Sequence, residues 1–79
     1  MSVNKTDNMK LRGIVALNVK RLRLTMGLSQ EELADICGYH RTYIGSVERS
    51  ERNITLSTLE SLSNALNVSP SDLLEVKSG

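Results

Sequence analysis

The sequence predicts an all-α domain of five helices. Along several segments the apolar residues recur every three or four positions, which is the period of a helix buried on one face. No segment alternates apolar and polar residues as a half-buried strand does. Polar caps and glycines separate the apolar segments, so each helix has a marked beginning or end.

The first predicted helix covers residues 9–26, and Gly27 is placed to end it in the left-handed conformation. The polar residues 1–8 before it are expected to form a flexible N-terminus. Residues 9–76 then form a single domain. The apolar stripe of the first helix consists of Leu11, Val15, Val19, Leu22 and Met26.

Residues 28–53 predict two short helices joined by a tight turn. Counted from Gln30 as the first position, a small residue stands fifth, a glycine ninth, and apolar residues fifteenth and eighteenth. This is the spacing of a DNA-binding helix-turn-helix, in which the small residue permits a close crossing and the glycine permits the turn. An ordinary helical hairpin is the alternative interpretation. The four residues are Ala34, Gly38, Ile44 and Val47.

The helix starts carry capping signals. Ser29 and Glu32 form an S-x-x-E capping box before the first motif helix, and His40 is a weaker cap candidate for the second. Thr55 is expected to cap a fourth helix. The fifth helix begins at Ser69-Pro70-Ser71-Asp72, with a cap, a proline and an acidic residue in the favoured order. The apolar stripe of the fourth helix is Leu56, Leu59, Leu62, Ala65 and Leu66.

The composition narrows the function classes. With one His and one Cys, the chain offers no set of four zinc ligands, and no phosphate-binding glycine loop or nucleophile elbow is present. We therefore expect no enzyme activity, no cofactor and no metal. Cys37 is interpreted as a buried thiol, with a redox sensor as the alternative. The absence of a signal peptide and of a long apolar run predicts a cytoplasmic protein without a membrane partner.

Charge is unevenly distributed along the chain. The net charge is only +1, but nine of the ten Lys and Arg residues lie within residues 1–52, which also contain the motif. A local positive surface is what DNA binding requires, although a mixed solvated surface would look similar in the sequence.

The chain resembles the lambda-repressor/Cro-like, or Xre-type, helix-turn-helix regulators over residues 11–75. Within that family, the segments Arg41-Thr42-Tyr43-Ile44 and Glu48-Arg49-Ser50-Glu51-Arg52-Asn53 are similar to the controller proteins of restriction–modification systems. The resemblance implies a five-helix lambda-repressor-like domain that dimerises on a double-stranded DNA operator and regulates its own gene and an endonuclease gene. A small phage-type repressor and an antitoxin-like autorepressor are the alternatives. The segments that carry the family resemblance are residues 19–23, 27–34, 43–49 and 59–68.

The N-terminal part of the second motif helix is expected to meet base edges in the major groove. Arg41 can donate two hydrogen bonds to guanine, and Thr42 can bond a base or touch a thymine methyl group. Tyr43 could contact DNA or instead cover the turn. Glu48 is interpreted as structural, paired with Arg23 or Arg52. The complete predicted DNA-binding set is Gln30, Arg41, Thr42, Tyr43, Ser46, Arg49, Arg52 and Asn53.

The sequence also predicts a homodimer. The C-terminal part of the chain holds more apolar residues than one short helix can bury, and a small core without Trp or Phe often gains stability from association. RNA polymerase could be a further partner of a regulator that activates transcription. The predicted dimer residues are Leu66, Val68, Leu73, Leu74 and Val76.

Overall fold

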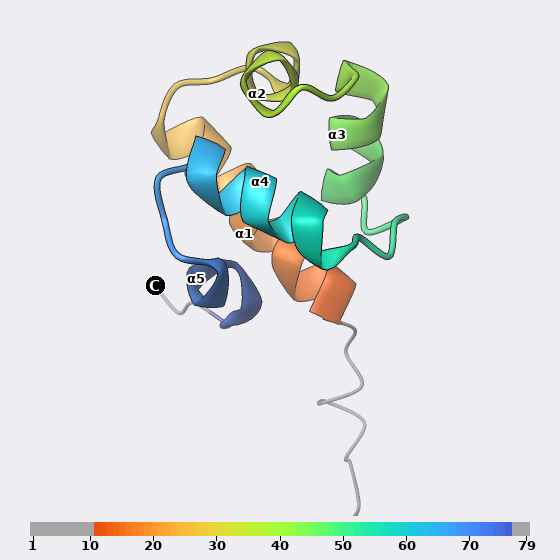
Figure 1. Cartoon of the computed structure of the whole chain (residues 1–79), viewed down its shortest axis with the longest axis vertical. Helices are drawn as coiled ribbons and strands as arrows, with labels where there is room; N and C mark the ends of the chain where they lie inside the picture. The colour runs from red at the N-terminus through yellow and green to blue at the C-terminus, as the bar shows by residue number, and fades with distance from the viewer. Residues whose placement is uncertain (1–10, 77–79) are drawn as a thin grey trace, which may run out of the picture.

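Five helices pack around one aliphatic core in the computed structural model, which describes residues 11–76 (Figure 1). No strand occurs among these residues, so the predicted all-α fold is confirmed. The predicted flexible segment 1–8 and the first residues of the predicted first helix lie outside the described range. The helices are α1 (Leu11–Thr25), α2 (Gln30–Cys37), α3 (Arg41–Glu48), α4 (Leu56–Ala65) and α5 (Pro70–Leu74).

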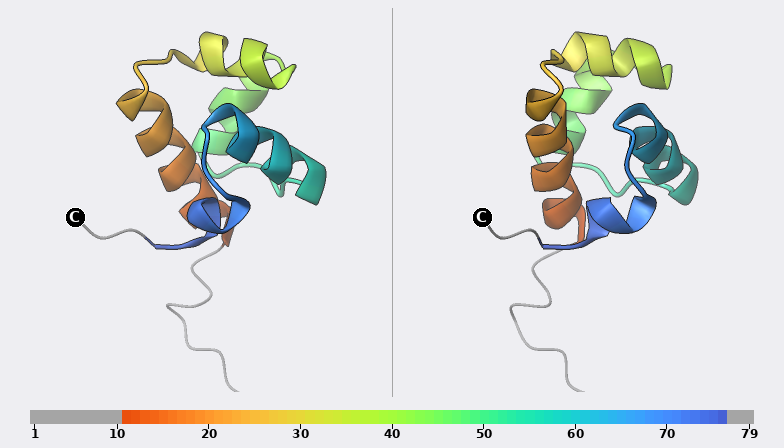
Figure 2. Two further views of the ribbon diagram at one scale, coloured as in Figure 1. Left: turned by 60° about the vertical axis from the view of Figure 1, so that its left-hand side comes forward. Right: turned by 90° about the vertical axis from the view of Figure 1, so that its left-hand side faces the viewer.

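Helix α1 is the longest element and contacts both α3 and α5 (Figure 2). Helices α2 and α3 pack against each other at one end of the molecule, while α5 lies near the beginning of α1 at the other end. Helix α4 bridges the two ends because it contacts α2 and α5. The C-terminal segment therefore lies far from the helix-turn-helix.

The core is built from one face of each helix. Its members are all aliphatic, as the lack of Phe and Trp requires, and they come from all five helices. Burial of this surface is the main favourable contribution to folding. The core residues are Val15, Val19, Leu33, Ala34, Ile44, Val47, Leu59, Leu62, Leu66 and Leu73.

Three residues of the predicted apolar stripes lie outside the core. Leu11 and Met26, at the two ends of the α1 stripe, are exposed, because neighbouring elements cover only the middle of that helix. Leu56 is 84% exposed at the first position of α4. In place of an apolar residue, Asn18 is buried on α1, where its side-chain amide donates to the carbonyl oxygens of Leu73 and Glu75. Asn18 thereby holds the end of α5 against α1.

Four helices end in the same backbone geometry, a Schellman motif with one left-handed residue. Gly27 and Gly38 occupy that position after α1 and α2, as predicted, with φ of 73° and 80°. Ser50 and Asn67 occupy it after α3 and α4, with φ of 63° and 58°. After α3, for example, the amide of Ser50 donates to the Val47 carbonyl and the amide of Glu51 donates to the Ser46 carbonyl.

Candidate nucleic-acid interface

Helices α2 and α3 form the predicted helix-turn-helix. The small residue Ala34 is buried where the two helices meet, and Ile44 and Val47 are buried on the inner face of α3. The turn passes through Gly38, whose left-handed conformation costs glycine little because it has no Cβ. The core residues of α3 thus fix the helix, and its exposed residues are those at its start, Arg41 and Thr42.

Each motif helix begins with the predicted cap. The Ser29 hydroxyl accepts the Glu32 amide at 2.9 Å, and the Glu32 carboxylate accepts the Ser29 amide at 2.8 Å, which completes the capping box. The Nδ1 atom of His40 accepts the Thr42 amide at 3.1 Å, so His40 does cap α3. His40 therefore sets the position at which the recognition helix starts.

Arg41 and Thr42 stand at the exposed start of α3. Within residues 11–76 neither side chain forms a hydrogen bond or ion pair, so both remain available to a ligand. Tyr43 is half-buried and packs against the core, with its ring centroid 5.1 Å from that of Tyr39. Its hydroxyl has no hydrogen-bond partner among the described residues. The packed ring agrees with the predicted packing role, while the hydroxyl is uncommitted and contact of Tyr43 with DNA stays a prediction.

The predicted base contact by Ser46 is wrong. Its side chain is buried, with 4% of the residue exposed, because the loop after α3 folds back over this turn of the helix. The Ser46 hydroxyl donates to the Tyr43 carbonyl at 2.6 Å and accepts from Nε of Arg52 at 3.0 Å. Ser46 therefore links Tyr43 of α3 to Arg52 in the following loop.

Gln30 begins α2 and joins a buried ionic network. Its amide nitrogen donates to Glu48 Oε1 at 3.0 Å, and Arg23 donates to the same carboxylate through Nε at 2.6 Å and Nη2 at 3.0 Å. The hydrogen bond to Glu48 is the largest cause that raises the pKa of Arg23, against an opposing contribution from desolvation. Of the two partners predicted for Glu48, Arg23 forms the ion pair. This network holds the start of α2 and the end of α3 against α1.

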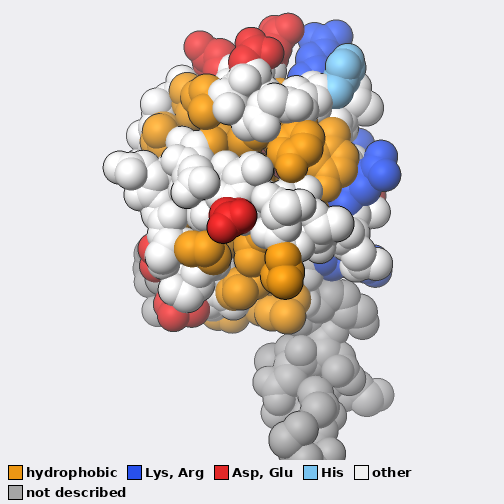
Figure 3. Space-filling model, viewed as in Figure 1, with side chains coloured by type: hydrophobic (Ala, Val, Ile, Leu, Met, Phe, Trp, Pro, Cys, Tyr) orange, Lys and Arg blue, Asp and Glu red, His pale blue; other side chains and the backbone are white. Residues whose placement is uncertain are grey.

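The basic residues after α3 are exposed. Arg49 forms an exposed ion pair with Glu51 at 3.1 Å, and Asn53 accepts from Nη1 of Arg12 at 3.3 Å. In Figure 3, Lys and Arg side chains gather along the edge formed by α3 and the following loop, whereas Asp and Glu side chains gather over α2. The uneven charge seen in the sequence thus corresponds to a positive surface beside α3.

Two interface residues were not predicted. Gly45 faces Gln30 and Arg49, and a Cβ there would lie 3.1 Å from Arg49 Nη1 and 3.4 Å from Gln30 Oε1. Arg12, on α1, reaches the loop after α3 through Asn53. A glycine inside a helical segment was the available signal for Gly45, but only the packing of α2 against α3 reveals its neighbours.

Two of the five predicted dimer residues are in the protomer core. Leu66 is 3% exposed and Leu73 is fully buried, so the prediction is wrong for both: packing of α5 against α1 and α4 already covers this part of the protomer. Val68 is half-buried, while Leu74 and Val76 are 37% and 78% exposed. These last two retain surface that a partner could cover.

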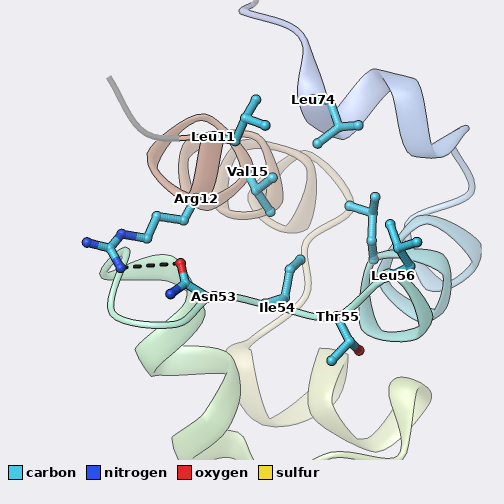
Figure 4. A pocket seen from close by; sticks show the side chains of 9 residues that line it. Leu11, Arg12, Val15, Asn53, Ile54, Thr55, Leu56 and Leu74 are labelled. Atoms are coloured by element: carbon cyan, nitrogen blue, oxygen red, sulfur yellow. Dashed lines mark hydrogen bonds between the residues drawn. The ribbon is translucent and has the colours of Figure 1, made fainter. Parts of the chain in front are cut away.

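Leu74 also lines an apolar groove between α1, α4 and α5 (Figure 4). The groove has a volume of about 270 Å³. Arg12 and Asn53 form its polar edge through their hydrogen bond. The lining residues are Leu11, Arg12, Val15, Asn53, Ile54, Thr55, Leu56, Leu59 and Leu74.

Other chemical sites are sparse over residues 11–76. No group of three or more His, Cys, Asp or Glu side chains in this range lies close enough to hold a metal ion. Within the same range no helix is long and apolar enough to cross a membrane. Cys37 is half-buried, and desolvation raises the pKa of its thiol, which donates to the Ser61 carbonyl.

Residues 19–73 match the helix-turn-helix family HTH_3. The chain belongs to this family. Its members regulate transcription by binding double-stranded DNA, so the chain is a DNA-binding transcriptional regulator.

Several relatives carry more specific names. The control protein C.SmaI of Serratia marcescens is 59% identical over 66 residues, which cover 84% of this chain and 79% of the relative. The control protein C.BamHI of Bacillus amyloliquefaciens is 44% identical over 71 residues, which cover 89% of this chain and 85% of the relative. The crystal structure of the restriction-modification controller protein C.AhdI from Aeromonas hydrophila superposes with a TM-score of 0.75 at 39% identity. The match covers 78% of this chain and 94% of the C.AhdI chain.

Proposed function

We propose that this regulator is the controller protein of a restriction–modification system. It binds an operator beside its own gene and controls transcription of that gene and of the endonuclease gene. The observation that carries the proposal is the exposed start of α3, where Arg41 and Thr42 are uncommitted within the described chain. The similarity to C.SmaI and C.BamHI supports the choice of controller over other small repressors.

The proposed reading mode follows from the geometry of α3. Arg41 and Thr42 contact base edges in the major groove, and the Tyr43 hydroxyl reaches a base or phosphate beside them. Gln30, Arg49, Arg52 and Asn53 stand around this helix and contact the phosphate backbone, which positions the protein without reading sequence. Gln30 still has a second amide hydrogen to offer after its bond to Glu48.

The operator is proposed to bind a homodimer with two-fold symmetry. The dimer surface includes the apolar groove, with its exposed lining residues Leu11, Leu56 and Leu74, and the C-terminal residues Val68 and Val76. A two-fold axis at this surface is expected to place the two recognition helices about 34 Å apart, one turn of DNA. Each dimer then reads two half-sites.

Regulation is proposed to depend on protein concentration alone. Dimerisation is second order in the protein, and occupation of neighbouring sites by two dimers adds steepness. The gene product then accumulates slowly, activates the endonuclease gene late and finally limits its own synthesis. Activation requires a second contact, with RNA polymerase. Because the ligand is chromosomal DNA, we place this activity in the cytoplasm.

The first test is a gel-shift titration with the DNA immediately upstream of the gene. We expect a near-palindromic element to be bound in preference to a scrambled sequence of the same composition, with an affinity that falls as salt rises. Equal affinity for both DNAs would overturn sequence-specific regulation. A phage-type repressor or an antitoxin-like autorepressor would bind as well, so this experiment does not by itself identify a controller.

The second test is transcription from that promoter and the endonuclease promoter with purified RNA polymerase and rising amounts of the protein. A controller gives activation at low concentration, repression at high concentration and a sigmoidal response. Repression without activation would favour the autorepressor alternatives. A linear response, or one that requires an added metabolite, would exclude control by concentration alone.

A further inference from the structure

The Tyr43 ring contacts two residues outside α3. It packs against Tyr39, with the ring planes tilted by 42°. The guanidinium of Arg52 also lies over the ring, with Cζ 5.5 Å from the centroid. This is within the range of a cation–π contact. The ring is therefore fixed while its hydroxyl has no partner among residues 11–76.

Arg52 is itself held in place by α3. Its Nε donates to the Ser46 hydroxyl at 3.0 Å, and that hydroxyl donates to the Tyr43 carbonyl at 2.6 Å. Ser46 thus connects the backbone of Tyr43 with the group that covers its ring. The Schellman motif at Ser50 makes the contact possible, because it reverses the chain after α3 and returns Arg52 to the helix.

Tyr39 is held in place by a hydrogen bond to α4. Its hydroxyl is 3.2 Å from the Thr58 hydroxyl, and Thr58 is buried on α4. A continuous series of contacts therefore runs from α4 through Tyr39 and Tyr43 to Arg52. Because two aromatic side chains and a planar cation have few rotamers in this arrangement, little conformational freedom remains to be lost when DNA binds.

We infer that Arg52 is a positioning residue for base recognition, acting through the ring of Tyr43 and anchored by Ser46. Its guanidinium orients the Tyr43 hydroxyl toward DNA, so base preference depends on Arg52 even where Arg52 touches only phosphate. This role rests on the proposed function. It differs from the role of Arg49, which is also basic and adjacent to α3 but pairs with Glu51 and not with Tyr43.

The experiment compares Arg52→Lys with Arg49→Lys. Both variants keep the positive charge, and only Arg52→Lys removes the planar group from the Tyr43 ring. Affinities are measured for the operator and for a panel of single-base variants. We expect Arg52→Lys to reduce the discrimination between bases about two- to fivefold per half-site at the base pair read by Tyr43. At the other base pairs the discrimination should change much less. Arg49→Lys should change all affinities by a similar factor and leave their ranking unchanged.

Two further variants separate positioning from direct contact. Ser46→Ala removes the anchor of Arg52 at a buried site, and we expect it to disturb the same base pair as Arg52→Lys. Tyr43→Phe keeps the ring and removes the hydroxyl, so in that background Arg52→Lys should no longer alter the ranking of operator variants. Thermal unfolding of each variant checks that its fold is retained, and Arg52→Lys at an exposed residue tests the inference even if Ser46→Ala unfolds.

NMR of the DNA-free protein detects the contact between Arg52 and the Tyr43 ring directly. The ring resonances of Tyr43 should shift in Arg52→Lys and remain in place in Arg49→Lys. Unchanged Tyr43 resonances, or a uniform loss of affinity in Arg52→Lys, would overturn the positioning role. If the wild-type protein shows no sequence preference at all, the proposed function fails, and the positioning role of Arg52 in base recognition fails with it. A shifted Tyr43 resonance in Arg52→Lys would still establish the contact between Arg52 and Tyr43.

Discussion

Glu48 occupies the last position of α3, and its carboxylate accepts hydrogen bonds from Arg23 on α1 and Gln30 on α2. The side chains of Arg23 and Glu48 are only 9% and 3% exposed. A buried pair with additional hydrogen bonds is costly to break, because removal of one charge leaves the other without compensation. At this scale, a polar residue of the recognition helix maintains the helix position rather than contacting DNA.

Replacement of Glu48 by Gln should therefore destabilise the protein strongly. The change keeps the shape of the side chain but leaves the Arg23 guanidinium without a counter-charge, at a cost of about 3–5 kcal/mol. The measurement is the free energy of unfolding in urea. Glu51→Gln is the matched control, since its pair with Arg49 is more than half exposed, and it should cost less than about 1 kcal/mol. Equal losses in the two variants would contradict a structural role for the buried pair.

Arg41 is the residue for which we expect the largest effect on specificity. Arg41→Ala should cost about 1–3 kcal/mol of binding free energy per half-site and relax preference at one base pair, which we expect to contain guanine. Arg49→Ala should weaken binding to all sequences and reduce its salt dependence. Binding isotherms on single-base operator variants measure both. A uniform loss in Arg41→Ala would identify Arg41 as a phosphate contact.

At the scale of helices, the ends of α3 decide what its surface can do. His40 caps the start, so the exposed Arg41 and Thr42 follow immediately. Ser50 closes the other end in the left-handed conformation and returns the chain to α3. A residue with a Cβ is strained in that conformation, whereas glycine is not. The loop that carries Arg52 therefore depends on a backbone geometry to which Ser is poorly suited.

Substitutions at Ser50 test this geometry. Ser50→Gly should leave stability unchanged or raise it by up to about 1 kcal/mol, because it relieves the left-handed strain. Ser50→Val should lower stability by about 1–2 kcal/mol, since a β-branched residue is unfavourable at positive φ. Thermal unfolding measures both changes. As a control, Ser57→Gly inside α4 should destabilise by about 0.5 kcal/mol, and a similar loss in Ser50→Gly would contradict the assigned geometry.

At the scale of the whole molecule, the start of α3 and the apolar groove lie in different regions, and Asn53 alone of the predicted DNA-binding residues lines the groove. The helix-turn-helix occupies one end, and the groove is formed by α1, α4 and α5 (Figure 1). Leu56, at 84% exposure, is the most exposed large apolar residue of the described chain. An apolar surface of this kind indicates an interface. Association can therefore be weakened by changes in the groove that leave Arg41 and Thr42 unaltered.

We expect the protein to be a dimer at 50 micromolar and Leu56→Lys to be a monomer at the same concentration. The added charge would have to be buried at the interface, which is unfavourable without a partner. Sedimentation equilibrium measures the mass. Leu24→Lys is the matched control, because Leu24 is also exposed but does not line the groove. A monomeric wild-type protein would contradict the dimer, and a dimeric Leu56→Lys variant would place its interface elsewhere.

Much of the fold follows from local sequence signals. The helix period, the capping box at Ser29, the start at Ser69-Pro70 and the glycine ends at Gly27 and Gly38 act over a few neighbouring residues, so they could be predicted without knowledge of the fold. The helix-turn-helix spacing is also local. For the same reason the sequence predicted Arg41 and Thr42, whose availability depends mainly on their position at a helix start.

The remaining assignments required the packing of distant segments. Burial of Leu66 and Leu73, the choice of Arg23 for Glu48 and the withdrawal of Ser46 from the surface depend on which helix lies opposite each residue. The left-handed ends at Ser50 and Asn67 carry no glycine, so their conformation is visible only in the structure. The sequence by itself determined the helices and the exposed start of α3. Only the tertiary structure decided which polar residues stabilise that helix and which remain available for DNA, because burial and hydrogen-bond partners arise from residues far apart in the chain.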